Sequence, residues 1–239
     1  MSLLIPHRRF NPQIPELMDD PHPDPTMLRD DLRNLRIINK YFGGLRVIQK
    51  YASKLMLQIN KSQPIHILDL ATGSADHPVA LAKFARSLGR SVRITAVERN
   101  PFTLAVAKER SAQFNEITFV QGDILAMAWS PKSYDIVLCS LAIHHFSRED
   151  AIRILRMMQE TARVGFVVND LDRSWPAAWI AWLYTHLTTR NPMTLNDSYV
   201  SVLRAFTLEE LRDIAGAAGV SNAQIRRHPM FRLALVSES

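Results

Sequence analysis

The stretch Ile65–Asp76, IHILDLATGSAD, decides how this chain folds. An apolar run opens it, with Pro64 in front and Gly73 just behind, and such a run is too short for a globular helix. It therefore predicts a buried parallel strand with Asp69 at its carboxyl end. A tight loop of small residues follows and opens a helix, which is the layout of a pocket for a nucleotide-like cofactor.

The loop ATGSAD contains one glycine, Gly73, between Ala71 and Ala75. A dinucleotide fingerprint needs three glycines, because its backbone must approach a pyrophosphate closely. An NAD-dependent oxidoreductase is therefore disfavoured. An adenosine-bearing ligand without a phosphate tolerates alanine at the outer positions, since only one close backbone approach is required.

Outward from this loop, strands alternate with helices. This alternation predicts a parallel sheet with right-handed crossovers and helices on both faces. Two closing runs, joined by a tight turn near Pro229, predict an antiparallel pair at the sheet edge. The fold class is therefore α/β, with a Rossmann-like, seven-stranded, mostly parallel sheet and an antiparallel C-terminal edge strand. The strands are predicted from Ile65 and over 92–98, 117–121, 134–139, 164–169, 224–227 and 231–236, and the helices over 78–88, 101–113, 147–161 and 207–218.

The N-terminal segment differs in character. Residues 1–25 carry six prolines and predict an extended arm that lies over the surface or is partly disordered. Two amphipathic helices follow, one capped by Thr26 and one over Leu45–Asn60. Because both precede the first strand, residues 1–60 are expected to form an arm and helical cap added to the core, and 61–239 the main domain.

An insertion of about residues 171–205 follows the fifth strand. Its first part, 174–187, is rich in Trp and Ala, and the next stretch, TTRNPMTLNDSY, is predicted to be irregular. Trp175, Trp179, Trp182 and Tyr184 suit a lid over a flat aromatic or lipid-tailed substrate. For the chain as a whole, a transient contact with a membrane surface is compatible with the sequence. Ordinary burial against the N-terminal helices explains the same residues.

The composition excludes or disfavours several other classes of protein. The 239 residues are 47% hydrophobic, which predicts one buried core, and the single cysteine excludes a disulfide framework. With no signal-peptide pattern, this predicts a cytoplasmic location. No apolar run reaches the ~18 residues of a membrane span. The net charge of +6 permits nucleic acid as a partner, but the basic residues are scattered and favour a solvated surface.

Two further carboxylates complete a cofactor pocket. Glu98 ends the second strand, where it can accept hydrogen bonds from two ribose hydroxyls. Asp123 follows the third strand and can accept from an adenine amine, while Ile124 and Leu125 offer apolar contact to the ring.

These motifs resemble those of the class I S-adenosylmethionine-dependent methyltransferases. ILDLATGSAD is similar to the first motif of that family, AVE to the second, GDIL to the third, and YDIVLCSLAIHHF to the segment near the methyl group. LMDDP, NKYFGG, VVNDL and SVLRAFT resemble a bacterial subgroup associated with methylation of phenolic or polyketide-type products. One departure is that the family commonly has glycine at Ala71 and Ala75.

The resemblance implies a cofactor, S-adenosyl-L-methionine, a product, S-adenosyl-L-homocysteine, and no metal. It implies substrate contacts at Tyr41, Asn169, Asp170 and Arg204. The implied cofactor-binding residues are Asp69, Ala71, Thr72, Gly73, Glu98, Arg99, Gly122, Asp123, Ile124, Ser140 and Leu141.

Two histidines follow the fourth strand. His144 or His145 can take a phenolic proton, with His144 preferred. Alternatively, one packs under the cofactor and the other caps the helix that begins near Ser147. Asn169 and Asp170 can bind a substrate hydroxyl, orient a histidine or cap a turn, and Arg204 can form an ion pair or bind substrate.

The leading hypothesis is methyl transfer to the oxygen of a small phenolic or polyketide-type molecule. The alternative is C-methylation of a quinone precursor. Nucleic-acid methylation is disfavoured because CSLAIHHF lacks the Asn/Asp-Pro-Pro-aromatic motif of amino-group methylases. A non-catalytic cofactor-binding scaffold is disfavoured by the intact Glu98, Asp123 and histidine pair.

Overall fold

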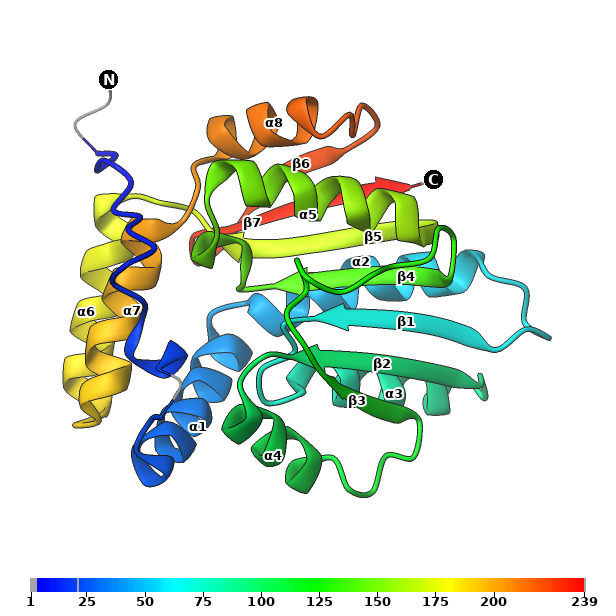
Figure 1. The fold of residues 1–239 in the computed structure, drawn as a ribbon, viewed down its shortest axis with the longest axis horizontal. Coiled ribbons are helices and arrows are strands. Elements are labelled where there is room, and N and C mark those ends of the chain that lie inside the picture. Colours follow the sequence, from blue (N-terminus) through cyan, green and yellow to red (C-terminus); the bar gives the residue numbers. More distant parts are fainter. Residues whose placement is uncertain (1–3, 21, 239) are drawn as a thin grey trace.

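The computed structural model describes residues 4–20 and 22–238, so residues 1–3 and 21 of the predicted arm lie outside the described part. Its centre is a seven-stranded sheet in the order β3-β2-β1-β4-β5-β7-β6 (Figure 1). The order reverses between β1 and β4, and in open α/β sheets ligands bind at the carboxyl ends of the strands at such a point. The strands are β1 (Ile65–Leu70), β2 (Val92–Glu98), β3 (Ile117–Gln121), β4 (Tyr134–Ser140), β5 (Ala162–Leu171), β6 (Gln224–His228) and β7 (Arg232–Glu238).

The sheet confirms the predicted fold class. Strands β1 to β5 pair in parallel, and β7 runs antiparallel to both β5 and β6. The C-terminal edge is therefore antiparallel, with β7 between β5 and the outermost strand β6. The helices are α1 (Pro25–Tyr41), α2 (Gly44–Gln58), α3 (Asp76–Ser87), α4 (Pro101–Arg110), α5 (Arg148–Thr161), α6 (Trp175–Thr188), α7 (Pro192–Arg204) and α8 (Leu208–Ala217), with short 3-10 turns η1 (Leu17–Asp19) and η2 (Ile143–His145).

Helices cover both faces of the sheet. On one face α5 and α8 pack through Ile154 and Leu211, and on the other α2 and α3 pack through Leu55 and Leu81. Each such side chain, once buried, contributes roughly 1.5–3 kcal/mol. Because α2 is part of this core, it is not the added cap that its position before β1 suggested.

A separate helical layer stands at the carboxyl ends of the parallel strands. It consists of α1, α6 and α7, with the described part of the N-terminal arm running along α7 (Figure 1). Over the described residues, no helix combines the length and apolarity needed to cross a membrane.

Two local predictions in this layer were wrong. The stretch expected to be irregular contains α7, because Asn191 caps it by accepting the N–H groups of Met193 and Thr194 while Pro192 occupies the first turn. Helix α1 is capped by Asp24, which accepts the N–H of Met27 at 2.8 Å, and not by Thr26. In both cases an Asx-Pro pair begins the helix.

Candidate active site

The loop after β1 is held by short polar contacts. Asp69 is buried, and the hydroxyl of Thr72 donates to its Oδ2 at 2.6 Å. Burial raises the pKa of Asp69 to about 7, against the opposing effect of that hydrogen bond. Ala71 and Ala75 have φ of 51° and 62°, so they adopt the left-handed backbone that glycine takes without strain. Each alanine costs about 1 kcal/mol there, and the loop keeps its path.

Glu98 ends β2 and faces this loop. One carboxylate oxygen accepts the N–H of Gly73 at 3.0 Å and the other accepts the N–H of Asn100 at 2.9 Å. Burial raises the pKa of Glu98, and the two N–H groups oppose that shift. Gly73 has open space on its side-chain side, since no atom lies within 4 Å of the position that a Cβ would take. The carboxylate is thus oriented by backbone beside an open loop.

Asp123 stands on the neighbouring rim, directly after β3. Its Oδ1 accepts the N–H of Leu125 at 2.9 Å, which fixes the turn. A Cβ at the preceding Gly122 would lie 2.5 Å from the sulfur of Met127, so a larger residue there would require the Met127 side chain to move. Gly122 therefore lets Met127 pack against the backbone of this turn.

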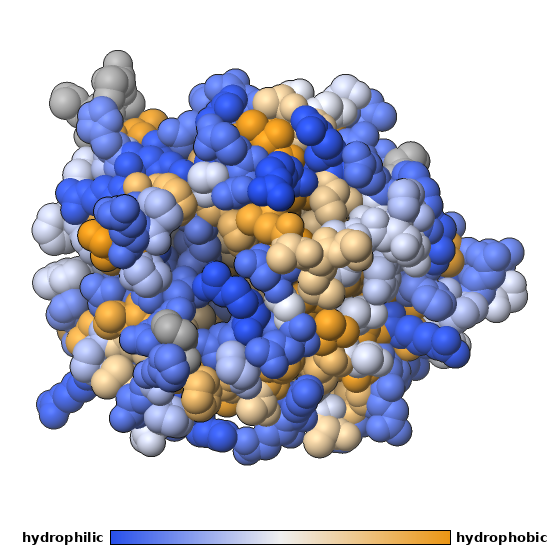
Figure 2. Space-filling model, viewed as in Figure 1, coloured by the Kyte–Doolittle hydropathy of each residue, from blue (hydrophilic) through white to orange (hydrophobic). Residues whose placement is uncertain are grey.

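A cavity of about 510 Å³ joins this loop to the helical layer, within the usual size of small-molecule sites. In the space-filling view this face is mostly hydrophilic and is hollowed between the helical layer and the sheet (Figure 2). Of the predicted site residues, those that line the cavity are Ala71, Thr72, Gly73, Glu98, Arg99, Asp123, Ser140, Leu141, His144, His145 and Arg204.

The other predicted site residues do not line it. Asp69, Ile124 and Asn169 are buried behind the wall, where the Asn169 amide donates to Ser140 Oγ at 2.9 Å. Tyr41 is 66% exposed at the end of α1, so the structure does not bring it to the cavity as predicted. Gly122 packs against Met127, and Asp170 contacts His144, which does line the cavity.

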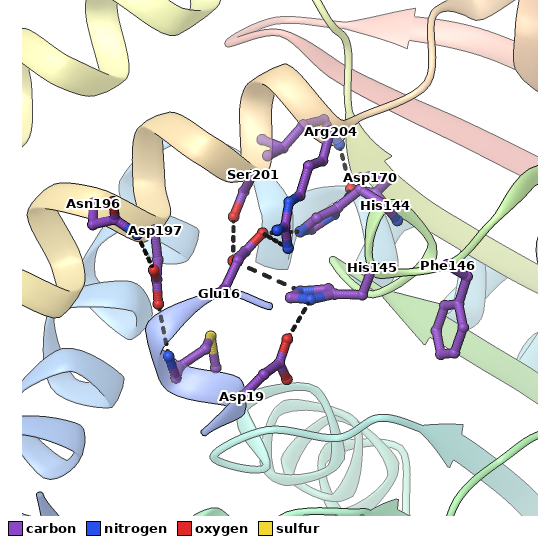
Figure 3. Close-up of polar contacts among 12 residues, drawn as sticks. Glu16, Asp19, His144, His145, Phe146, Asp170, Asn196, Asp197, Ser201 and Arg204 are labelled. Atoms are coloured by element: carbon purple, nitrogen blue, oxygen red, sulfur yellow. Dashed lines mark hydrogen bonds and ion pairs between the residues drawn. The ribbon is translucent and has the colours of Figure 1, made fainter. Parts of the chain in front are cut away.

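His144 is held by Asp170. The ring Nδ1 lies 2.6 Å from Asp170 Oδ1, and the backbone N–H of His144 donates to Oδ2 at 3.1 Å (Figure 3). Burial would raise the pKa of Asp170, but the His144 ring and these N–H groups lower it overall. Because the charged carboxylate can only accept, the ring Nδ1 carries the proton and donates it, and Nε2 of the neutral ring is left as an acceptor.

His145 has two carboxylate neighbours on the N-terminal arm. Its Nδ1 lies 2.9 Å from Asp19 Oδ2, and its Nε2 lies 3.9 Å from Glu16 Oε2. Burial favours the neutral ring, but Glu16 and Asp19 outweigh it and raise the pKa of His145 to about 9. His145 is therefore a charged donor at neutral pH.

The arm is anchored where sequence reasoning expected only a surface segment. The Asp197 carboxylate of α7 accepts the N–H groups of Leu17 at 2.9 Å and Met18 at 2.8 Å. Arg8 donates to the carbonyls of Arg204 and Phe146. The sequence analysis therefore missed several functional candidates: Arg8, Glu16, Asp19, Asp197 and Ser201. The two adjacent carboxylates of the motif LMDDP were the one signal that pointed to this part of the arm.

Arg204 forms the ion pair that was one of its two predicted roles. Its Nη1 lies 3.6 Å from Glu16 Oε1, and its other terminal nitrogen donates to the Ile14 carbonyl. It therefore joins α7 to the arm at the cavity wall.

A family model described as a methyltransferase domain matches residues 61–207. The chain belongs to this family, and its fold is that of the class I S-adenosylmethionine-dependent methyltransferases, whose cofactor is S-adenosyl-L-methionine.

Individual relatives are distant. Demethylmenaquinone methyltransferase of Staphylococcus aureus (strain MRSA252) is 24% identical over 126 residues, which are 53% of this chain and 50% of that protein. The chain therefore spans about half the length of the curated relatives it matches.

Solved structures share the fold at low identity. The plantazolicin methyltransferase BpumL in complex with SAH has a TM-score of 0.68 and 15% identity, and the match covers 94% of each chain. An O-methyltransferase family 2 protein from Planctomyces limnophilus in complex with apigenin has a TM-score of 0.57 and 18% identity, over 88% of this chain and 61% of the other. At this identity these likenesses concern the fold alone.

Proposed function

We propose that this chain transfers the methyl group of S-adenosyl-L-methionine to a phenolic hydroxyl of a small molecule, with His144 as general base. One observation carries the proposal. The Asp170-held ring of His144 presents an acceptor nitrogen to a cavity that also reaches the cofactor loop.

The residues present fit the cofactor. Glu98 would accept from the ribose hydroxyls, Asp123 from the adenine amine, and the open side of Gly73 would face the ligand. When bound, the cofactor supplies a methyl group on a positively charged sulfur and leaves as the neutral thioether S-adenosyl-L-homocysteine.

The chain's own residues then remove the proton of the acceptor hydroxyl. A phenol has a pKa of about 10, so at neutral pH its oxygen gains nucleophilicity when a base takes the proton. His144 Nε2 accepts that proton, and the electron pair of the O–H bond stays on oxygen for the new O–C bond. Asp170, 2.6 Å from Nδ1, stabilises the resulting imidazolium. A positioned base contributes roughly 10²–10⁴-fold, and alignment of the reactants in a dry site contributes further.

The part of the cavity wall that α6 provides suits a flat aromatic acceptor. Tyr184 of α6 meets Phe42 edge to face, with ring centroids 4.8 Å apart, and both rings line the cavity. Ile180 also lines it, whereas Trp179 is 62% exposed. We therefore assign the lid to the inner face of α6, formed by Ile180 and Tyr184, and not to its tryptophans.

A second candidate is C-methylation of a quinone precursor. It is favoured by the similarity to a demethylmenaquinone methyltransferase, and a hydroquinone can give its proton to the same base. We prefer the O-methyl hypothesis because a protein that shares this fold is found in complex with apigenin, a phenol.

A transfer assay with labelled S-adenosyl-L-methionine tests the proposal. The acceptors are simple phenols, demethylated quinols, fatty phenols and bulk tRNA, and each product is examined by NMR for an O–CH₃ or C–CH₃ group. Labelled O-methyl phenol is expected. A C-methyl quinol as the only product would support the second candidate, and label in tRNA alone would overturn both.

A further inference from the structure

One carboxylate oxygen in the cavity wall is buried without a hydrogen bond. Glu16 is 1% exposed, and the hydroxyl of Ser201 donates to its Oε2 at 2.7 Å. Its Oε1 accepts no hydrogen bond from residues 4–20 or 22–238. Although Arg204 balances its charge, a buried oxygen without a hydrogen bond is costly, so a ligand group that donates to Oε1 would be favoured.

The surroundings of Glu16 are polar and converge on one point of the cavity. Glu16 Oε1 lies 3.9 Å from His144 Nε2 and 3.6 Å from Arg204 Nη1. In the close-up, the Glu16 side chain extends from the arm toward the histidines and Arg204 (Figure 3). These separations are too long for direct hydrogen bonds, which are about 2.7–3.2 Å.

The group that fits must offer more than one proton. Glu16 Oε1 and His144 Nε2 are both acceptors, because Asp170 holds the other ring nitrogen of His144. A single phenolic hydroxyl has one proton and satisfies one of them. Arg204 Nη1 and the charged His145 ring are donors, and they can serve the oxygen atoms of the ligand.

We propose that Glu16 binds a second hydroxyl of the acceptor, so that the substrate is a dihydroxylated aromatic ring. One hydroxyl gives its proton to His144 and is methylated, while the other donates to Glu16 Oε1 and is not. This inference rests on the proposed function and deepens it. Glu16 is then a specificity residue carried by the N-terminal arm.

A metal ion is the competing occupant. Glu16, His144 and His145 offer ligand atoms within 4.8 Å of one another. Tetrahedral zinc with bonds of ~2.1 Å needs its ligand atoms ~3.4 Å apart, whereas the two closest ring nitrogens lie 3.9 Å from the Glu16 oxygens. The Arg204 guanidinium, 3.6 Å from Oε1, also supplies positive charge where a cation would lie. Geometry and charge therefore favour a hydroxyl.

Matched acceptors test the assignment on the unmodified protein. Resorcinol and catechol are compared with their mono-O-methyl ethers, which keep the ring and remove one hydroxyl. A hydrogen bond to a charged group corresponds to roughly a tenfold to hundredfold gain, so KM is expected to rise by that factor for the ethers, with kcat little changed. Equal KM values within each pair would overturn the inference.

Glu16→Gln is the companion variant. It keeps an oxygen for Ser201 and removes the charge, so it should raise KM for the diols about tenfold more than it raises KM for the mono-ethers. Asp20→Asn, an exposed change on the same arm, is the control and should behave as the parent. Thermal unfolding of both variants checks the fold, and the acceptor comparison stands without them. An equal rise of KM for diols and ethers would contradict a specific role for Glu16.

The acceptor assay also distinguishes failure of the proposed function from failure of this inference. Failure to methylate any phenol removes the proposed function and this inference together, whereas methylation of phenols without discrimination removes the inference alone. Calorimetric titration with Zn²⁺ or Mn²⁺ covers the metal alternative. One ion bound per chain, lost in Glu16→Gln, together with activity abolished by EDTA, would overturn the hydroxyl assignment. No binding of either ion supports it.

Discussion

The two ends of the cavity are built in different ways. At the end that we propose for the cofactor (the cofactor end), short loops after neighbouring strands provide the wall, and Glu98 reaches backbone only 25 residues away. At the end that we propose for the acceptor (the acceptor end), Asp19 meets His145 across 126 positions and Glu16 meets Ser201 across 185. The cofactor end therefore follows from the order of the strands, whereas the acceptor end exists only when arm, α7 and η2 come together.

The two ends also differ in how their carboxylates are satisfied. Both oxygens of Glu98 accept backbone N–H groups, whereas Glu16 has one buried oxygen without a hydrogen bond among the described residues. A satisfied carboxylate is a rigid reference point for a constant ligand. An unsatisfied one selects among variable ligands, because only those that complete it bind well.

The largest effect is expected from loss of Glu98, which should weaken binding of the cofactor. Glu98→Ala removes the two charge-assisted hydrogen bonds that we propose to the ribose, each worth roughly 1.5–3 kcal/mol, so affinity for S-adenosyl-L-methionine should fall by roughly 10²–10⁴. Isothermal titration calorimetry measures it. Glu109→Ala, an exposed change on α4, is the control, and an unchanged affinity in Glu98→Ala would remove Glu98 from the site.

Loss of His144 should affect the acceptor end alone. His144→Ala should lower kcat by roughly 10²–10³ and change affinity for the cofactor less than about threefold. Single-turnover rates and calorimetry separate the two effects. His186→Ala, an exposed histidine on α6, is the matched control. Equal single-turnover rates in parent and variant would mean that alignment alone suffices.

The His145 contacts should make the acceptor end sensitive to pH. Its pKa is raised to about 9 in the folded state from about 6.5 unfolded, so the stabilisation is fully present below pH ~6.5 and is lost as pH rises through ~9. On the order of 1–3 kcal/mol of unfolding free energy should disappear over that interval. Urea unfolding of the parent and His145→Gln at pH 6 and 9.5 measures the difference. The gap between them should shrink at high pH, and a constant gap would show that His145 is not charged in the fold.

The smallest effect is expected in the loop after β1. Ala71→Gly relieves left-handed strain of about 1 kcal/mol, and the greater freedom of glycine when unfolded offsets most of it. The net change in unfolding free energy should stay below about 1 kcal/mol, with cofactor affinity unchanged. Denaturant midpoints and calorimetry check both. A large loss of affinity would show that the Ala71 methyl group contacts the ligand.

Much of the fold and of the cofactor end was predictable from sequence. Apolar runs of strand length, separated by helical periodicity, define the parallel sheet, and the carboxyl ends of its strands must meet at one edge. Glu98 and Asp123 therefore line the same cavity as Gly73, whereas Ile124 does not line it. Helix α7 was missed because polar residues hide its pattern, despite the Asn191-Pro192 start.

The sequence by itself determined the sheet, the cofactor loop and the pair of histidines after β4. The tertiary structure decided which carboxylate each histidine meets, that Tyr41 stays outside the cavity, and that α6 turns Tyr184 inward and Trp179 outward. The physical reason is the separation along the sequence between the residues that must meet. Strand order and backbone turns are local or periodic properties, whereas side chains more than a hundred positions apart meet only through the packing of whole elements, which no short pattern encodes.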